Sequence, residues 1–344
     1  MKYVIYWFIY CKIVVIINQY IIKMKKLIFT AASMLLLISC QNEEVVSTTE
    51  TTRATVSFET ARRGCASHEV LEAQLKADPK LALRMEQIEA FTKSAMLQGR
   101  LVNGQIQIPV VVNVLYRTTA ENISQAQIQS QIDVLNKDFN ALNTDYNSVP
   151  TLFSSVKANV GISFVLETVI RKATRKTSWG TADAMKKTTK GGLNPTSPNT
   201  KLNIWACTIG GGILGYAQFP GGSSATDGVV IDSKYFGLSS TASYPYNLGR
   251  TATHEVGHWM NLRHIWGDAT CGSDLVTDTP SHNTANYGVP TYPHYSTCTG
   301  TPVEMTMNYM DYTDDRGMYM FSVGQKSRMD AIFLSGASRA SFRL

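Results

Sequence analysis

Three of the six histidines of this 344-residue chain fall between positions 254 and 264, and their spacing limits how this stretch can fold. On a helix, His254 and His258 lie one turn apart on the same face, so both rings can point at one ion. A helix that continued to His264 would turn that third ring away. The chain must therefore leave the helix first. Asn261 is the expected exit, because asparagine tolerates the left-handed conformation that ends helices.

This turn allows His264 to become a third ligand of the same ion. Three neutral imidazoles with an open fourth position are the arrangement of a catalytic zinc, and Glu255 is placed to reach a water on that ion. The pattern HExxH on a helix is typical of the zinc site of metalloproteases. The alternative is a pair of solvated histidines on an amphipathic helix, but a third histidine at this spacing argues against it.

The N-terminal region indicates export. Residues 24–39 combine a short basic start with an apolar run and are followed by Cys40, which resembles a bacterial lipoprotein signal peptide with its lipid anchor on Cys40. An ordinary secretory signal with an incidental cysteine is the alternative. Residues 1–23 are also apolar and long enough to span a membrane, but a start site placed too early is favoured, because Met24 begins a complete signal. Either interpretation exports the rest of the chain, where disulfides can form.

Composition excludes some partners. The net charge of +6 is modest, and no run of Lys and Arg is interleaved with aromatic residues, so no nucleic-acid partner is expected. A hydrophobic content of 44% supports a normal soluble core. We expect a monomer that contacts a membrane only through the lipid at Cys40.

The rest of the chain has an α/β pattern. Residues 41–57 are a polar tether, and residues 66–97 are helical, broken at Pro79 and separate from the α/β region downstream. A helix capped by Ser124 and the helix that begins near Leu248 and carries His254 lie among predicted strands, which favours an α/β lobe. The predicted strands are 106–116, 161–167, 202–207 and 228–231, and a last helix is predicted at 325–333.

A second motif lies downstream of the histidines, at residues 308–312. Alone, it is a turn with a buried methionine. Together with the histidine motif, it resembles the Met-turn of the metzincins, in which Met310 would lie beneath the metal. Further segments, in matching order, extend this resemblance to the pappalysin family and its compact microbial members over about residues 101–344. These segments are 204–207, 212–221, 276–280, 308–315, 321–325 and 328–329.

The resemblance implies an α/β fold of the metzincin type. Its parts are an upper lobe of mixed twisted sheet and helices, an active-site helix, and an irregular lower lobe with the Met-turn and a C-terminal helix. Residues 101–344 would form the catalytic domain, and residues 40–100 would form the tether and an inhibitory pro-segment. Such a protein is a zinc-dependent endopeptidase that acts on proteins or peptides.

The family resemblance also assigns roles to individual residues. Glu255 would be the general base, and Tyr312 would support the oxyanion, although a packed core tyrosine is the alternative. Asp315 would lie at the base of the pocket for the residue after the cut, which predicts cleavage before Arg, with Lys weaker. The alternative for Asp315 is a solvated acidic loop.

The resemblance also implies a role for a cysteine upstream of the catalytic domain. Cys65 resembles the pro-segment residue that ligates the zinc and keeps the precursor latent, since a thiolate is a strong zinc ligand. The alternative is a pairing of Cys65 with Cys207, although Cys207 falls in a predicted buried strand. If the enzyme cuts before Arg, the Gly99–Arg100 bond is a candidate site of self-activation.

The family further implies a disulfide between Cys271 and Cys298, worth roughly 3 kcal/mol by chain-entropy estimates. Two free thiols are the alternative. A second family disulfide is missing, because Gly317 stands where a cysteine is often found. The family usually has glycine where Asn261 stands. A calcium site is also implied, with oxygen ligands near Asp268, Asp274, Thr277 and Asp278.

Two other functions compete with the protease. One is a catalytically silent surface binding protein on the same fold, which the intact Glu255 and three histidines argue against. The other is a metal-dependent hydrolase that acts on something other than protein, which only substrate profiling distinguishes.

Overall fold

The computed structural model describes residues 62–98, 106–239 and 241–342. The predicted signal segment, Cys40, the polar tether and the Gly99–Arg100 bond lie outside the described residues. Among the helices in these ranges, none combines the length and the apolar character needed to cross a bilayer.

A five-stranded sheet forms the upper lobe, in the order β3-β1-β4-β6-β5. β1, β3, β4 and β6 run parallel, whereas β5 is antiparallel to β6 and forms one edge. The central strand β4 is buried along its whole length, as expected for a parallel strand covered on both faces. The strands span Ile106–Tyr116 (β1), Ile162–Ala173 (β3), Leu202–Cys207 (β4), Gly215–Ala217 (β5) and Val229–Asp232 (β6).

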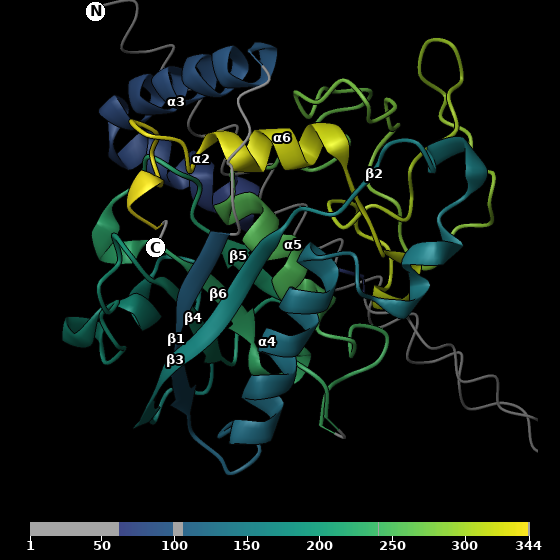
Figure 1. The fold of residues 1–344 in the computed structure, drawn as a ribbon. Coiled ribbons are helices and arrows are strands. Elements are labelled where there is room, and N and C mark those ends of the chain that lie inside the picture. Colours follow the sequence, from purple (N-terminus) through teal and green to yellow (C-terminus); the bar gives the residue numbers. More distant parts are fainter. Residues whose placement is uncertain (1–61, 99–105, 240, 343–344) are drawn as a thin grey trace, which may run out of the picture. The chain divides into compact units, whose positions relative to one another are not determined.

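Helices α4 and α5 pack on this sheet (Figure 1). Helix α4 (Gln125–Phe139) begins after Ser124, whose hydroxyl accepts a hydrogen bond from the Gln127 amide, as predicted. Its apolar face joins the main core. Helix α5 (Arg250–Trp259) carries the histidine motif, packs on α4, β5 and β6, and is buried at every residue. The core therefore fixes the direction of each α5 side chain.

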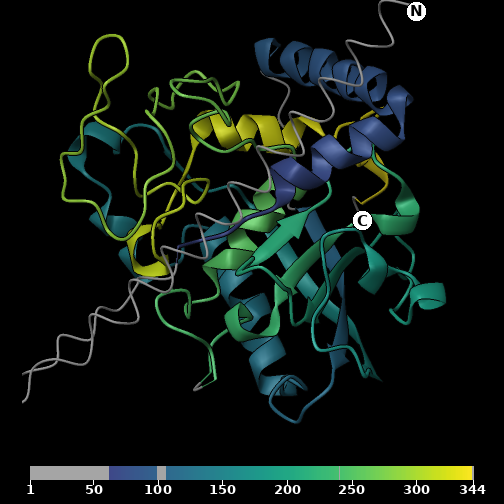
Figure 2. The same cartoon turned by 180° about the vertical axis from the view of Figure 1, so that it is seen from behind.

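The predicted helical segment upstream of the sheet forms two helices, α2 (Ser67–Ala77) and α3 (Pro79–Leu97). The break falls at Asp78, whose carboxylate accepts a hydrogen bond from the Lys80 amide. The sequence suggested that this segment is separate from the α/β region downstream. The structure shows that the two are packed together. α2 packs on β5 and α3 packs on α6, and Leu71 and Leu81 cluster with Phe219 (Figures 1 and 2).

The lower lobe has little regular structure. A short antiparallel pair, β2 (Lys157–Ala158) with β7 (Phe321–Ser322), leads into the C-terminal helix α6 (Val323–Ala331), which begins with a capping box. A disulfide joins Cys271 to Cys298. The remaining loops contain short 3-10 helices: Thr144–Ser148 (η1), Thr151–Phe153 (η2), Ala184–Lys186 (η3), Thr188–Lys190 (η4), Ser224–Thr226 (η5), Ser233–Tyr235 (η6), Asp315–Gly317 (η7) and Ala340–Phe342 (η8).

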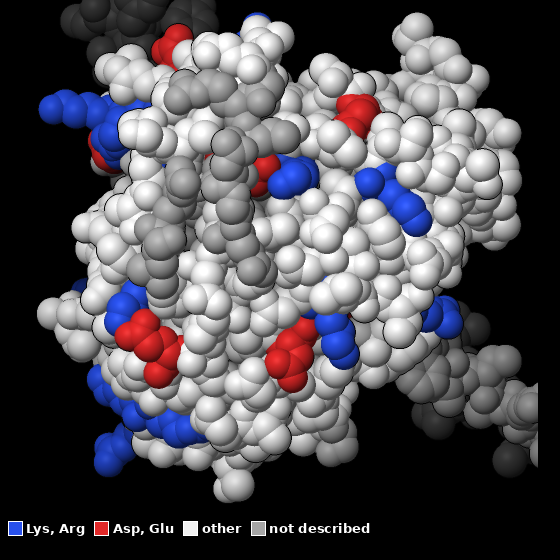
Figure 3. Space-filling view, in the orientation of Figure 1, with Lys and Arg blue, Asp and Glu red and all other residues white. Residues whose placement is uncertain are grey.

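The expected strands are present, with different ends. β3 continues to Ala173, beyond the predicted end at residue 167, and the site helix begins at Arg250 rather than near Leu248. The edge strand β5 was missed, because three residues next to a glycine-rich stretch carry no strand pattern. The face of the molecule in Figure 3 shows basic and acidic side chains interspersed, in agreement with the absence of basic runs in the sequence.

Candidate active site

The end of helix α5 gathers the three histidines. α5 ends at Trp259, and Asn261 follows in the left-handed region with φ of 73°. The chain reverses there, and the Leu262 amide donates a hydrogen bond to the Gly257 carbonyl (3.0 Å). The predicted exit at Asn261 is therefore confirmed, and it brings His264 back to the face of α5 that carries the other two rings.

The histidine nitrogens converge on one point. The Nε2 atom of His258 lies 3.2 Å from that of His254 and 3.0 Å from that of His264. With the Sγ atom of Cys65 they form a buried set of four potential ligands within 4.8 Å of one another. Ligands of a tetrahedral zinc, about 2.0–2.1 Å from the ion, would lie roughly 3.3 Å apart.

The hydrogen bonds made by the Nδ1 atoms of the rings determine whether the Nε2 atoms are free to bind a cation. Nδ1 of His254 lies 2.7 Å from the Tyr309 carbonyl, and Nδ1 of His258 lies 2.8 Å from the Leu262 carbonyl. A carbonyl only accepts, so each Nδ1 carries the proton and each Nε2 presents its lone pair to the centre. Burial also lowers the pKa of both rings well below the usual value, which favours the neutral form. Converging lone pairs of this kind fit a zinc ion.

Met310 lies directly behind the three histidines. A Cβ atom placed on Gly257 would lie 2.5 Å from the Met310 sulfur, so only glycine fits between the helix and the Met-turn. The Met310 carbonyl also accepts a hydrogen bond from the Ile265 amide (3.1 Å). Met310 thus lies against the helix at the histidines, in the position expected of the Met-turn methionine.

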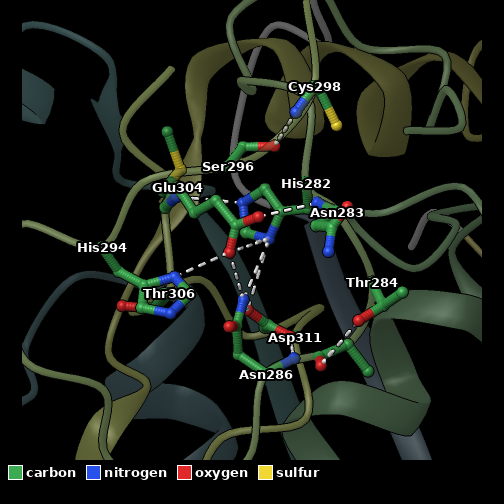
Figure 4. Close-up of polar contacts among 12 residues, drawn as sticks. His282, Asn283, Thr284, Asn286, His294, Ser296, Cys298, Glu304, Thr306 and Asp311 are labelled. Carbon is green, nitrogen blue, oxygen red and sulfur yellow. Dashed lines mark hydrogen bonds and ion pairs between the residues drawn. The ribbon is translucent and has the colours of Figure 1, made fainter. Parts of the chain in front are cut away.

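A polar cluster, which the sequence did not reveal, anchors this turn from below (Figure 4). The Asp311 carboxylate accepts hydrogen bonds from the amides of Tyr312 and Asn286, each 2.8 Å long. The Asn286 side chain in turn donates to Asp311 and to Glu304. His282 lies 3.4 Å from Asp311 and accepts from the Met305 amide. The cluster therefore fixes the backbone on either side of the Met-turn and of Tyr312.

Cys65, two residues before α2, points its sulfur toward the histidines. Cys65 is bridged to Gly215 in β5, and the flanking bonds run from Leu214 to Gly64 (2.7 Å) and from Ala66 to Gly215 (3.1 Å). Cys65 and Cys207 are both free and buried, so the alternative pairing between them is not formed. Cys207, the last residue of β4, belongs to a buried apolar cluster that includes Trp205 and Tyr216.

Glu255 contacts the same segment. Its Oε2 atom accepts a hydrogen bond from the Ser67 hydroxyl (2.8 Å) and lies 3.4 Å from the Cys65 sulfur. The Ser67 oxygen also accepts from the Ala217 amide of β5 (2.8 Å). Burial raises the pKa of Glu255 to about 7. The sequence gave no indication that Ser67 would cover Glu255, since an isolated serine has no distinguishing pattern.

The Asp315 carboxylate is paired with the guanidinium of Arg63, which belongs to the same segment as Cys65 and Ser67. Its Oδ1 atom lies 2.5 Å from a guanidinium nitrogen of Arg63, and neither side chain is more than 1% exposed. Its Oδ2 atom accepts from the amides of Leu248 and Arg250. Asp315 is thus not on a solvated acidic loop. Arg63 was also missed, although its position two residues before Cys65 was the available signal.

Tyr312 faces two of the three histidines. Its ring packs against His254, His264 and Trp266, and its hydroxyl donates to the Cys65 carbonyl (3.2 Å). Burial raises the pKa of Tyr312 well above the usual value, so the hydroxyl keeps its proton and remains a donor.

The residues predicted to bind calcium do not meet as one set of carboxylates. Asp268 bonds to Nδ1 of His264 (2.5 Å) and so orients that ring. Asp274 accepts from Val276 and Thr279, and Asp278 accepts from Ser322 and Gly324. Thr277 is exposed. Among the described residues, the group of three or more such ligands is that of Cys65 with the histidines. Calcium therefore stays a prediction.

Comparison with known proteins agrees with this geometry. Residues 205–334 match the family model described as pregnancy-associated plasma protein-A. The extracellular metalloprotease 1 of Coccidioides posadasii is 32% identical over 264 residues, which cover 72% of this chain and 86% of that protein. An extracellular metalloprotease of Colletotrichum graminicola is 32% identical over 292 residues, with 81% and 92% covered.

Two solved structures extend the likeness to the fold. A mutant of Tannerella forsythia promirolysin superposes with a TM-score of 0.75 at 40% identity, covering 82% of this chain and 97% of that one. Mature mirolysin in complex with a cleaved peptide gives 0.68 at 42% identity, covering 71% and 97%. From the fold, the buried histidines and these relatives together, the chain belongs to the pappalysin family of metzincin metalloproteases.

Proposed function

We propose that this chain is the latent precursor of a zinc endopeptidase that cleaves peptide bonds before arginine, and before lysine less well. The observation that supports this most is the course of residues 62–67 through the cleft. This one segment fills the Asp315 pocket with Arg63, points Cys65 at the histidines and covers Glu255 with Ser67. A pocket that buries an arginine in the precursor is suited to an arginine of the substrate.

The residues of the chain divide the chemistry of hydrolysis among them. Zinc, held by His254, His258 and His264, would acidify a water and polarise the scissile carbonyl. Glu255 would take the proton of that water and deliver it to the leaving amine. Tyr312 would donate its hydroxyl proton to the developing oxyanion, as it donates to the Cys65 carbonyl in the precursor.

The direction of the segment explains how it escapes cleavage. In a substrate, the chain would pass from the metal to the Asp315 pocket, because the arginine follows the cut. In the precursor, Arg63 in the pocket precedes Cys65 at the histidines. The segment therefore runs opposite to a substrate while it occupies the same edge of β5. It presents the Cys65 thiol to the histidines.

Several finer features remain part of the proposal. The names of the fungal relatives support secretion, and that of promirolysin supports a pro-segment. We propose export with a lipid anchor at Cys40, self-cleavage near Gly99–Arg100 and a monomeric catalytic domain. Calcium bound near Asp274 and Asp278 would be structural, since Asp278 joins its loop to the start of α6.

Incubation of the activated protein with a peptide library tests the proposal. We expect cuts before arginine, fewer before lysine, and none after a chelator removes the metal. Glu255→Gln keeps the side-chain shape and removes the base, so it should bind zinc in elemental analysis and lose nearly all cleavage. Full activity in a zinc-loaded Glu255→Gln protein would refute the role of Glu255. Cleavage with no preference for basic residues would refute that of Asp315.

A further inference from the structure

We propose that Arg328, with Arg263 beside it, forms a carboxylate-binding site on the catalytic domain. Glu89 of α3 fills this site in the precursor. After the pro-segment leaves, the site accepts an acidic side chain of the substrate, several residues before the cut. The substrate role rests on the proposed function, whereas carboxylate binding itself does not.

The present occupant shows what the site recognises. The two terminal nitrogens of Arg328 lie 2.5 and 2.6 Å from the two oxygens of Glu89, which is a bidentate arginine–carboxylate pair. With α3 in place, the Arg328 side chain is 1% exposed, whereas that of Glu89 is 32% exposed. The cation comes from α6 of the catalytic domain, and the anion comes from the helix that covers it.

The catalytic domain also orients the arginine. The third guanidinium nitrogen, Nε, donates to the Asn261 carbonyl (2.7 Å). This bond leaves the two terminal nitrogens directed at α3. Because Asn261 and α6 remain when the pro-segment is removed, the pair of donors stays preorganised for a carboxylate.

The charge of Arg263 adds to that of Arg328 and further favours an anion at the position of Glu89. The pKa of Glu89 is lowered because the hydrogen bonds and charge of Arg328, together with the charge of Arg263, outweigh the effect of burial. Among the described residues, Nε of Arg263 is buried without a hydrogen-bond partner. Asp274 also interacts with the charge of Arg328, but its carboxylate is bonded to Val276 and Thr279. Loss of Glu89 therefore leaves a buried guanidinium without its paired anion, which is strongly unfavourable.

The course of the pro-segment places the site relative to the cleft. The segment passes from the Asp315 pocket to the histidines, and then to His68, which lies 3.6 Å from Asp268. From there α2 leads away, and α3 returns over α6 with Glu89 (Figure 1). A substrate with its arginine at Asp315 would extend its N-terminal part toward this side. The recognised residue therefore precedes the cut.

The first experiment tests carboxylate binding without any proteolysis. In the full chain with Glu255→Gln, which stays intact, Glu89→Ala removes the carboxylate and its methylene, and acetate supplies the same atoms. We expect Glu89→Ala to lower the melting temperature and acetate to restore part of it, more than chloride at equal ionic strength. Acetate should not raise the melting temperature of the parent with Glu89 or of the double variant Glu89→Ala/Arg328→Gln more than chloride does. Equal effects of acetate and chloride on Glu89→Ala would overturn the proposal.

The second experiment distinguishes the substrate from a free carboxylate as the ligand. Activated protein is given peptides with arginine after the cut and either Glu or Gln at successive earlier positions. We expect one position at which Glu raises kcat/KM roughly tenfold, through KM, as a bidentate charged pair allows. The preference should disappear in Arg328→Gln, weaken in Arg263→Gln and fall when acetate is added.

The outcomes separate the two proposals. If no peptide is cleaved, the proposed function fails, and the acetate experiment still decides whether the site binds carboxylates. If Glu and Gln peptides are cleaved equally at every position, the protease proposal stands and the substrate role of the Arg328 site is refuted. Rescue by acetate with no Glu preference would show that the site serves the pro-segment alone.

Discussion

Replacement of Arg63 by glutamine should release the latent enzyme. Arg63 and Asp315 form a buried ion pair 2.5 Å long, which joins the segment before α2 to the proposed substrate pocket. Arg63 also donates to the Thr313 carbonyl and lies over the Tyr246 ring. The variant leaves Asp315 buried without its cation, while the bonds of Cys65 and Ser67 to the site remain. The loss therefore falls on the docking of the segment and not on the catalytic residues.

The magnitude follows from the burial of the pair. Removal of one partner of a buried ion pair costs about 3–5 kcal/mol. Asp315 keeps two backbone donors, Leu248 and Arg250, so the lower end applies. A loss of about 3 kcal/mol changes the equilibrium between docked and released pro-segment about 150-fold. Arg63→Lys keeps the charge but not the planar group. The docking equilibrium of this variant should therefore lie between that of the parent and that of Arg63→Gln.

The assay follows the appearance of activity from the full-length precursor. Protein purified with a chelator is mixed with zinc and a fluorogenic peptide that has arginine after the cut. The lag before activity and the rate of self-processing on gels are compared among variants. We expect the Arg63→Gln precursor to activate on the order of a hundredfold faster than the parent.

The neighbouring arginine supplies a matched control. Arg62 is exposed and lies over the Tyr287 ring at 5.2 Å, an exposed contact worth about 0.5–1 kcal/mol. Arg62→Gln removes the same charge from the same segment and should change the lag only a few-fold. The reasoning is refuted if Arg63→Gln folds, binds zinc and remains as latent as Arg62→Gln.

Three further predictions concern the metal-binding helix and the pro-segment. Gly257→Ala places a methyl group 2.5 Å from the Met310 sulfur, so urea unfolding should show a loss of about 1–3 kcal/mol, and an unchanged midpoint would contradict the packing. Asn261→Gly should keep its zinc affinity in equilibrium dialysis. Asn261→Val should bind zinc more weakly, because valine at φ of 73° is strained by about 1–2 kcal/mol. Equal zinc affinities of the two variants would show that the turn does not hold the site. The pKa of Glu89 is lowered in the docked state because its ion pair with Arg328 outweighs burial, so its contribution is complete above the free value of 4.5 and is lost as the pH falls through the lowered pKa. Limited proteolysis against pH should therefore show acid release of the pro-segment, and Glu89→Gln should remove this dependence.

Local patterns predicted most of the regular elements. The strands at 106–116 and 202–207 and the Ser124 cap were correct, because each depends on apolar runs or on bonds between near neighbours. The edge strand β5 was not predicted, since its formation depends on pairing with β6 and not on its own three residues. The docking of α2 and α3 was also missed, because amphipathic helices do not reveal which surface they cover.

The same division holds within the site. The sequence alone determined the placement of His254, Glu255 and His258 on one helix and the need for a turn at Asn261, because helical periodicity and backbone sterics act over a few residues. Only the tertiary structure decided that Arg63 meets Asp315, that Ser67 covers Glu255 and that Glu89 reaches Arg328. These contacts join residues about 190 to 250 positions apart in the chain. They depend on which buried charges and hydrogen-bonding groups the folded core leaves to be paired, and no local pattern encodes that.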